Sequence, residues 1–226
     1  MFKNPQAFIF DLDGVITDTA EWHYQAWKSL ASGLGITIDR DFNERLKGVS
    51  RMESLEKILA LDPSLKGVSW EKKQALTFEK NEHYKRLIGQ IDSSYILPGI
   101  ESLIHRLREK KIPIALGSAS KNAVSVLNQL GLIEHFDYIV DASKIQYGKP
   151  HPETFLNAAD YLSVPYQGCI GIEDAPTGVT ALNEAGMFSI GIGQSEHLAH
   201  ADYRLNVTSE LDFDQIIEAF GAYKNR

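Results

Sequence analysis

The stretch AFIFDLDGV, residues 7–15, decides the fold that this chain predicts. It opens with four apolar residues in a row, which is typical of a strand buried on both faces in a parallel sheet. The strand stops at Asp11, and a second acid, Asp13, follows two positions later. Because strand side chains alternate with a period of two, we expect both carboxylates to leave the sheet on one side. Gly14 then allows a sharp turn.

The carboxyl ends of parallel strands are where open α/β sheets bind their ligands, so the end of this strand is a candidate site. The alternative is an Asx turn that only ends the strand. The rest of the chain has to decide between the two.

Composition narrows the classes of partner. The chain has 226 residues, of which 43% are hydrophobic and 23% charged, as expected for a globular protein. The formal net charge of −7 makes nucleic acid and anionic membrane poor partners, and we expect neither. An anionic ligand would therefore need a local cluster of Lys and Arg side chains.

Cysteine usage and the N-terminus are also informative. The only cysteine, Cys169, lies in an apolar run, so we expect a buried thiol and no disulfide or cysteine metal cage. The first residues lack the apolar core of a signal peptide, and no apolar run approaches the roughly 18 residues of a membrane span. We therefore expect a cytoplasmic protein.

Hydrophobic periodicity predicts two kinds of organisation along the chain. Helical patterns at 20–34, 41–46, 50–59 and 69–88 follow the first strand without another strand between them, and the last of these is longer and charged. Ser50 and Glu53 form a capping-box pair that opens the helix at 50–59. Strand patterns at 112–116, 138–140, 169–172 and 188–192 then alternate with helical ones at 100–110, 122–130, 152–162, 177–185 and 212–223. In the pattern at 152–162, Pro152 stands at a favourable first-turn position. This alternation predicts an α/β fold with a parallel sheet, residues 1–17 and 94–226, and an inserted helical domain, 18–93.

Polar residues follow two more strands. The strand at 112–116 runs into Gly117-Ser118-Ala119-Ser120-Lys121-Asn122, whose hydroxyl and N–H donors at a helix start predict an anion site. A plain serine N-cap is the alternative. The strand at 169–172 ends in Glu173-Asp174, a pair that suggests hard-cation binding, with helix capping by Asp174 as the alternative.

A lysine stands between these segments. Pro150 holds Lys149 in an extended backbone, and a stiff turn can aim the ammonium inward. The alternative is an exposed surface lysine, and we expect His151 to be an exposed turn residue.

The four acids at two strand ends predict a bound cation. Two unit charges 4 Å apart repel by about 4 kcal/mol at an effective dielectric of 20. Asp11, Asp13, Glu173 and Asp174 cannot all stay ionised together without a counter-charge. Mg²⁺ is the natural candidate, because it prefers carboxylate and phosphate oxygens.

These motifs resemble a known family. Asp11-Leu12-Asp13-Gly14-Val15, Ser118, Lys149-Pro150 and Glu173-Asp174 resemble, in order, the four motifs of the haloacid dehalogenase superfamily. The helical segment resembles its C1-type cap, which implies a Rossmann-like core with an inserted cap domain. Residues 11–19, 47–51 and 118–122 further resemble the beta-phosphoglucomutase family, and the likeness covers nearly the whole chain.

The resemblance implies roles for the core residues. Asp11 is the nucleophile that becomes an aspartyl phosphate, and Asp13 is the general acid and base. Mg²⁺ is held by the Asp11 carboxylate, the Asp13 carbonyl and Asp174, with Glu173 close by or acting through water. Ser118, the Ala119 N–H and Lys149 hold the transferring phosphoryl group.

It also implies a phosphosugar site. Arg51, with Ser120, Lys121 and Asn122, resembles the site for the phosphate that is not reacting. The residues that resemble those orienting Asp13 and the sugar are Thr19, His23, Trp27, Lys47 and Gly48. For Trp27, packing in a hydrophobic core is the alternative.

The implied reaction converts beta-D-glucose 1-phosphate into glucose 6-phosphate through a beta-glucose 1,6-bisphosphate intermediate. The implied partners are a phosphosugar substrate and a sugar bisphosphate activator, and we expect a monomer. Two reactions compete with this one: a sugar-phosphate phosphatase, in which water attacks the phosphoenzyme, and a phosphonatase that uses Lys47 in a Schiff base. A non-catalytic sugar-phosphate sensor is an alternative of another class.

Overall fold

A computed structural model of the chain describes residues 4–46, 49–194 and 196–224. The chain divides into two compact units. The unit that we name the core unit comprises the residues up to Asp18 and from Asp92 onward, and the helical unit is Thr19–Ile91.

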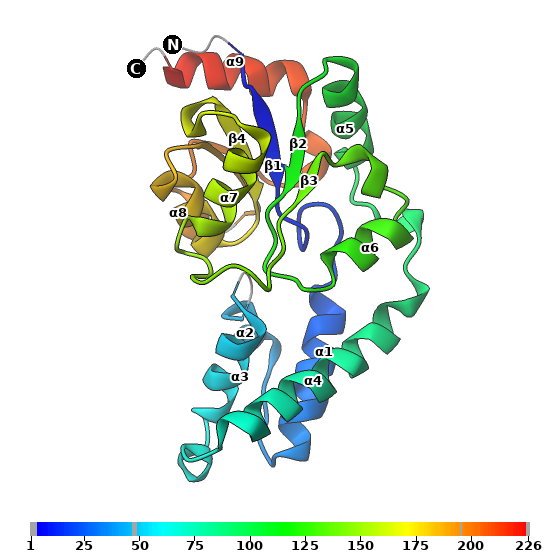
Figure 1. Cartoon of the computed structure of the whole chain (residues 1–226), viewed down its shortest axis with the longest axis vertical. Coiled ribbons are helices and arrows are strands. Elements are labelled where there is room, and N and C mark those ends of the chain that lie inside the picture. The colour runs from blue at the N-terminus through cyan, green and yellow to red at the C-terminus, as the bar shows by residue number, and fades with distance from the viewer. Residues whose placement is uncertain (1–3, 47–48, 195, 225–226) are drawn as a thin grey trace. The chain divides into compact units, whose positions relative to one another are not determined.

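The core unit is built on a six-stranded sheet whose strands all pair in parallel, in the order β3-β2-β1-β4-β5-β6. Figure 1 shows β1 lying between β2 and β4. The strands are β1 Ala7–Phe10, β2 Ile114–Leu116, β3 Tyr138–Ile139, β4 Cys169–Glu173, β5 Phe188–Ile192 and β6 Tyr203–Leu205. The predicted parallel α/β fold is therefore confirmed.

In the described residues of the core unit, five α-helices lie between these strands in the chain or follow the last of them. They are α5 Ile100–Glu109, α6 Ala123–Gln129, α7 Glu153–Leu162, α8 Pro176–Glu184 and α9 Phe213–Lys224. All four residues of β1 are fully buried, because β1 lies inside the sheet and its side chains are covered on both faces. Ile9 packs in one cluster with Phe155 of α7 and Leu182 of α8. Cys169, the predicted buried thiol, lies in the same cluster.

The helical unit consists of α1 Ala20–Gly33, α2 Arg40–Glu44, α3 Arg51–Leu59 and α4 Trp70–Leu87, and its described residues contain no strand. Helix α3 begins with the predicted capping box: the Ser50 hydroxyl accepts the Glu53 N–H, and the Glu53 carboxylate accepts the Ser50 N–H. The helical unit has a hydrophobic cluster of its own, which includes Trp27, Leu55 and Leu76.

The structure corrects three details of the predicted elements. Strand β6 was not predicted, because it has only three residues at the edge of the sheet, of which Leu205 alone is buried, so its apolar pattern is short. Pro152 precedes α7 as its N-cap and does not occupy the first helical turn. Helix α8 is not capped by Asp174, since Ala175 is its N-cap.

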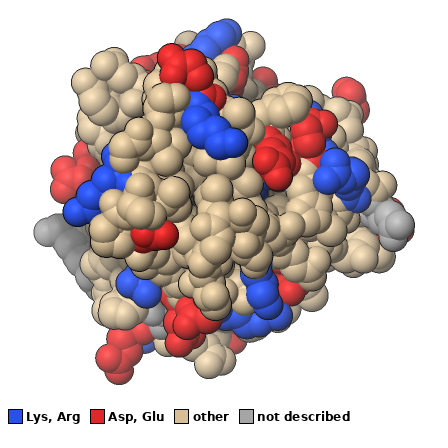
Figure 2. Space-filling model, turned by 90° about the horizontal axis from the view of Figure 1, so that it is seen from below, with Lys and Arg blue, Asp and Glu red and all other residues tan. Residues whose placement is uncertain are grey.

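Two surface properties bear on partners. Among the helices that the structure describes, none combines the length and apolar character that a membrane crossing requires. On the face shown in Figure 2, the described basic and acidic side chains are interspersed and do not gather into one basic patch.

Gly171 in the middle of β4 provides a test of the packing of the core unit. A Cβ at this position would lie 2.0 Å from Cδ2 and 2.8 Å from Cγ of Leu182, which is fully buried, so the whole side chain would have to shift within the core. We expect Gly171→Ala to lower the free energy of unfolding by about 1–3 kcal/mol, measured by urea denaturation.

Gly221→Ala in α9 is the matched control, because no atom lies within 4 Å of the added Cβ. It should leave the stability unchanged or raise it by up to about 1 kcal/mol, through helix propensity. Equal midpoints for Gly171→Ala and the original chain would contradict the packing seen here.

Candidate active site

The candidate residues of the core unit follow three neighbouring strands. Asp11 comes directly after β1, Ser118 lies two residues after β2, and Glu173 is the last residue of β4. Because β2, β1 and β4 are adjacent and parallel, their carboxyl ends meet at one edge of the sheet. This is also where the strand order changes direction, the usual position of a ligand crevice in open α/β sheets.

Lys149 lies at the centre of this edge. Its Nζ donates to Oδ1 of Asp11 at 2.7 Å and also to Oε1 of Glu173. The residue is only 2% exposed, and its ammonium lies 4.8 Å from the ring centroid of Phe155. The alternative of an exposed surface lysine is therefore wrong, whereas His151 is exposed as expected.

The acids form a group that could hold a metal ion. Ligand atoms of Asp11, Glu173 and Asp174 all lie within 4.8 Å of one another. Gly14, with a φ of 80°, leaves room for the Asp174 carboxylate: a Cβ there would lie 2.2 Å from Oδ2 of Asp174. A donor set made of oxygens suits a hard divalent cation.

Burial and neighbouring charges shift the pKa values of Glu173 and Lys149. Burial raises the pKa of the Glu173 carboxyl above its usual range, although the Lys149 ammonium opposes this shift. Burial alone would lower the pKa of Lys149, but the charges of Asp11 and Glu173 outweigh it and raise that pKa. Lys149 thus supplies part of the counter-charge that the sequence argument assigned to a metal. One ammonium does not balance three carboxylates, and the group still favours a cation.

Asp13 is placed by the turn after β1. Leu12 O accepts the N–H of Ile16, and the N–H of Gly14 donates to Thr17 O at 2.8 Å. Asp13 is half-buried, and its carboxylate does not belong to the group of candidate metal ligands found in the described residues. Coordination of a metal by the Asp13 carbonyl stays a prediction.

The segment after β2 forms two successive hydroxyl turns. The Ser118 hydroxyl accepts the N–H of Ser120 at 3.1 Å, and the Ser120 hydroxyl accepts the N–H of Asn122 at 3.3 Å. Ser118 and Asn122 are buried, Ala119 and Ser120 are half-buried, and Lys121 is exposed. The N-cap of α6 is Asn122, so the alternative of a plain serine cap is wrong.

Within the helical unit, His23 of α1 and Lys80 of α4 form a close pair. Lys80 Nζ lies 2.7 Å from Nδ1 of His23, and an ammonium donates but cannot accept. We infer that Nδ1 accepts this bond and that the ring proton is on Nε2. The His23 ring stacks on Tyr84 with a centroid distance of 4.0 Å, which fixes its orientation.

The surroundings keep this imidazole neutral. Burial, followed by the charges of Lys80 and Arg51, lowers the pKa of His23 well below its usual range. Burial also lowers the pKa of Arg51, which is half-buried at the start of α3. Trp27 is 3% exposed in the hydrophobic cluster, so its packing role is real, and its ring lies 4.7 Å from the Lys80 ammonium. Thr19 is buried as the N-cap of α1.

Lys80 was missed by the sequence argument, which treated 69–88 as a charged helix. The sequence did contain a signal for the burial of Lys80. The buried residues of α4 are Leu76, Lys80 and Tyr84, which recur every four positions along one helix face. Lys47 and Gly48, which the sequence singled out, lie outside the described residues.

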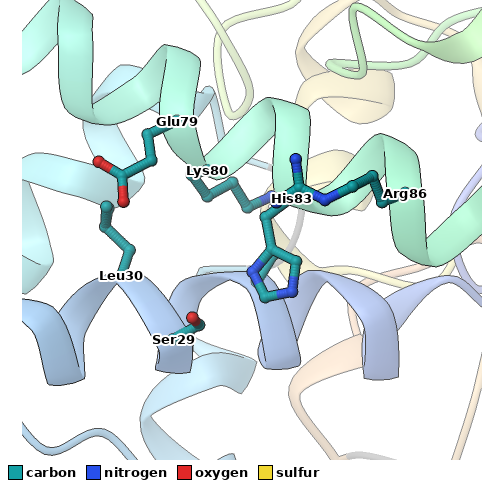
Figure 3. Close-up of a pocket in the computed structure, with 7 residues that line it drawn as sticks. Ser29, Leu30, Glu79, Lys80, His83 and Arg86 are labelled. Carbon is teal, nitrogen blue, oxygen red and sulfur yellow. The ribbon is translucent and has the colours of Figure 1, made fainter.

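Figure 3 shows a hollow between α1 and α4, where His83 points from α4 toward α1. It is lined by Ala26, Ser29, Leu30, Glu79, Lys80, His83 and Arg86. Its volume of about 160 Å³ is below the roughly 300–1,000 Å³ of typical ligand pockets, so we place no substrate there.

Comparisons with known proteins agree with this geometry. A family model for haloacid dehalogenase-like hydrolases matches residues 5–186. The chain is 44% identical over 221 residues to a beta-phosphoglucomutase of Bacillus subtilis, covering 98% of each protein. It is 30% identical to a fructose-1-phosphate phosphatase of Escherichia coli, over 85% of this chain and 98% of the relative.

A solved structure is also similar. The crystal structure of a beta-phosphoglucomutase from Clostridium difficile superimposes with a TM-score of 0.96 and 51% identity, over 98% of this chain and 100% of that one. Because the family model spans most of the sequence and these relatives cover nearly its full length, the chain belongs to the haloacid dehalogenase-like hydrolase family.

Proposed function

We propose that this chain is a beta-phosphoglucomutase, which interconverts beta-D-glucose 1-phosphate and glucose 6-phosphate. The observation that carries the proposal is the buried Asp11 carboxylate, held by Lys149 beside Glu173 and Asp174. This arrangement presents a nucleophile next to positive charge and candidate metal ligands, as phosphoryl transfer requires. The near full-length similarity to beta-phosphoglucomutases supports this choice of substrate.

The acidic group fits a divalent cation, and we propose Mg²⁺. Asp11 and Asp174 would hold it together with the Asp13 carbonyl, while Glu173 would act close by or through water. When bound, the ion neutralises charge on the transferring phosphoryl group. The Asp174 carboxylate keeps its place because Gly14 has no side chain.

In the proposed mechanism, a carboxylate oxygen of Asp11 attacks phosphorus and forms an aspartyl phosphate. Asp13 protonates the departing oxygen and later takes a proton from the attacking sugar hydroxyl. The transferring phosphoryl group is held by the Ser118 hydroxyl, the Ala119 N–H and the Lys149 ammonium. Lys149 is already fixed by its two carboxylate partners, so little reorganisation is needed.

A mutase must also hold the phosphate that is not reacting. We propose Arg51 for this task, because a guanidinium binds phosphate with two parallel hydrogen bonds. Ser120, Lys121 and Asn122 would assist it, and Thr19, His23, Trp27, Lys47 and Gly48 would orient Asp13 and the sugar. We add Lys80 to this set, since it determines which nitrogen of His23 carries the proton. The helical unit, Thr19–Ile91, would then serve as the cap domain.

Two other functions, a sugar-phosphate phosphatase and a non-catalytic sensor, compete with the proposed mutase. A sugar-phosphate phosphatase would use the same core residues with water as the acceptor, as a phosphatase among the relatives suggests. The half-buried Arg51 favours the mutase, because a phosphatase needs no second phosphate site. A non-catalytic sensor would not need an intact nucleophile. We expect the enzyme to be a cytoplasmic monomer that is activated by a sugar bisphosphate.

Metal dependence is the first prediction for this function. Removing divalent ions with excess chelator should abolish turnover, because the acids keep uncompensated negative charge around the phosphoryl group. Added Mg²⁺ should restore it, in a coupled assay for glucose 6-phosphate. Asp174→Asn should raise the Mg²⁺ concentration for half-maximal rate by about 10-fold or more. Full activity in chelator would reject the metal assignment.

The two aspartates should respond differently to substitution. Asp11→Asn removes the nucleophile, so no phosphoenzyme should form. Asp13→Asn should bind the phosphosugar but transfer about 10²–10⁴-fold more slowly, because it removes the proton relay. The measurement is mass spectrometry of the intact protein together with steady-state rates, with Asp214→Asn as an exposed control. Near-normal turnover of Asp11→Asn would rule out the covalent route.

A third prediction separates mutase from phosphatase. Phosphorus NMR should show beta-glucose 1-phosphate becoming glucose 6-phosphate, with a lag that trace beta-glucose 1,6-bisphosphate shortens, since the bisphosphate phosphorylates Asp11. Arg51→Ala should slow this conversion by about 10- to 100-fold through loss of charge-assisted hydrogen bonds to phosphate, and should slow phosphate release less.

Arg86→Ala, an exposed arginine of the same unit, is the control and should keep the mutase rate. If inorganic phosphate is the main product and no glucose 6-phosphate appears with bisphosphate present, the phosphatase reading replaces the mutase.

A further inference from the structure

The loop that carries Lys149 is fastened to the start of α7 by one side chain. The N–H of Gln146 donates to Oε1 of Glu153 at 2.8 Å, and the N–H of Tyr147 donates to Oε2 at 2.8 Å. Glu153 is the first residue of α7. A single carboxylate therefore accepts two successive backbone N–H groups that lie two and three residues before Lys149.

Further hydrogen bonds close the loop on the other side of Lys149. The N–H of His151 donates to Gly148 O at 3.0 Å, and the N–H of Glu153 donates to Nδ1 of His151 at 3.2 Å. The Tyr147 and His151 rings are 4.9 Å apart between centroids. We name residues 146–153 with these bonds the clasp, and Lys149 lies in its middle.

The same helix turn supports the side chain of Lys149. Phe155, two residues after Glu153, is fully buried with its ring 4.8 Å from the ammonium. Glu153 thus fixes the backbone of the loop, and Phe155 lies beside the ammonium of Lys149. Because the Lys149 side chain begins on this loop, we expect a displacement of the loop to alter the hydrogen bond between Lys149 Nζ and Oδ1 of Asp11.

A carboxylate is the group best suited to this position. It accepts two N–H groups at once, whereas the amide of glutamine offers one oxygen and turns donor hydrogens toward the second N–H. Negative charge is also favoured at a helix N-terminus. Accordingly, the hydrogen bond from the Gln146 N–H holds the pKa of Glu153 below its usual range, and the bond from Tyr147 adds to this, although burial acts in the opposite direction.

We propose that Glu153 is a positioning residue for phosphoryl transfer, which acts by clasping the loop so that Lys149 meets Asp11 and the phosphoryl group. Its use in catalysis rests on the proposed function. The clasp itself rests only on the contacts above. The hydrogen bonds that the structure describes for Glu153 involve neither Asp11 nor the acidic group, so its effect would reach the reaction through Lys149.

The test compares Glu153→Gln and Glu153→Asp with Glu101→Gln. Glu101 is also a first-turn acid of a ten-residue helix in the core unit, but it is exposed and anchors no loop in the part of the chain that the structure describes. Glu153→Gln should lower kcat by about 10- to 100-fold with little change in KM, because small displacements of a catalytic group have effects of this size. Glu153→Asp keeps the charge and should recover part of kcat, whereas Glu101→Gln should change neither constant.

A second readout does not depend on turnover. Lys149 is 2% exposed, so brief acetylation followed by peptide mass spectrometry should modify it slowly in the original chain. Glu153→Gln should increase its acetylation several-fold without a matching increase at other lysines, and Glu101→Gln should not. If the original chain makes no glucose 6-phosphate, the mutase proposal fails, while the acetylation arm still tests the clasp.

Two results would overturn the inference. One is Glu153→Gln with the original kcat and the original protection of Lys149. The other is an equal loss of kcat in Glu153→Gln and Glu101→Gln together with equal losses of thermal stability. That result would mean that Glu153 only stabilises a helix terminus and does not position Lys149.

Discussion

The buried ammonium of Lys149 is the constraint on which the rest of the core unit depends. An ion removed from water is tolerated only when partners of opposite charge surround it closely, and here Asp11 and Glu173 provide them. Asp11 directly follows β1 and Glu173 ends β4, whereas Lys149 comes from the loop before α7. The three segments must therefore reach their final positions together, because each alone would leave an unpaired buried charge.

The sheet satisfies this constraint by its strand order. Placing β1 beside both β2 and β4 brings the ends of three strands to one edge, although more than 100 residues separate β1 from β2 in the chain. The all-helical insertion does not disturb this pairing, since it leaves after the turn at Gly14 and has a hydrophobic cluster of its own. Parallel strand pairing, and not proximity in sequence, thus brings the candidate active-site residues together.

Local patterns determined how much could be predicted. The apolar run of β1, the Ser50–Glu53 capping box and the acids after the strands depend on near neighbours, and these features were found from sequence. The burial of Lys149 could not be found this way, because its partner Asp11 is 138 residues away. Lys80 was missed for the same reason: its environment comes from α1, and a lysine in a charged helix looks solvated. The short edge strand β6 lacked a readable pattern.

The division of the chain into two units also bears on which acceptor, water or a sugar hydroxyl, would receive the phosphoryl group. Asp11, Lys149 and the acidic group would transfer a phosphoryl group to water as readily as to a sugar, because nothing in their chemistry distinguishes two hydroxyl groups. Selection must then come from binding energy that only the sugar phosphate supplies, and that energy has to be realised in the transition state. Arg51 and the His23–Lys80 pair are polar groups kept at least partly from solvent in the helical unit. Buried polar groups discriminate strongly between ligands, because a ligand that leaves them unpaired binds weakly. Under the proposed function, we assign the choice between mutase and phosphatase to Arg51 and the His23–Lys80 pair.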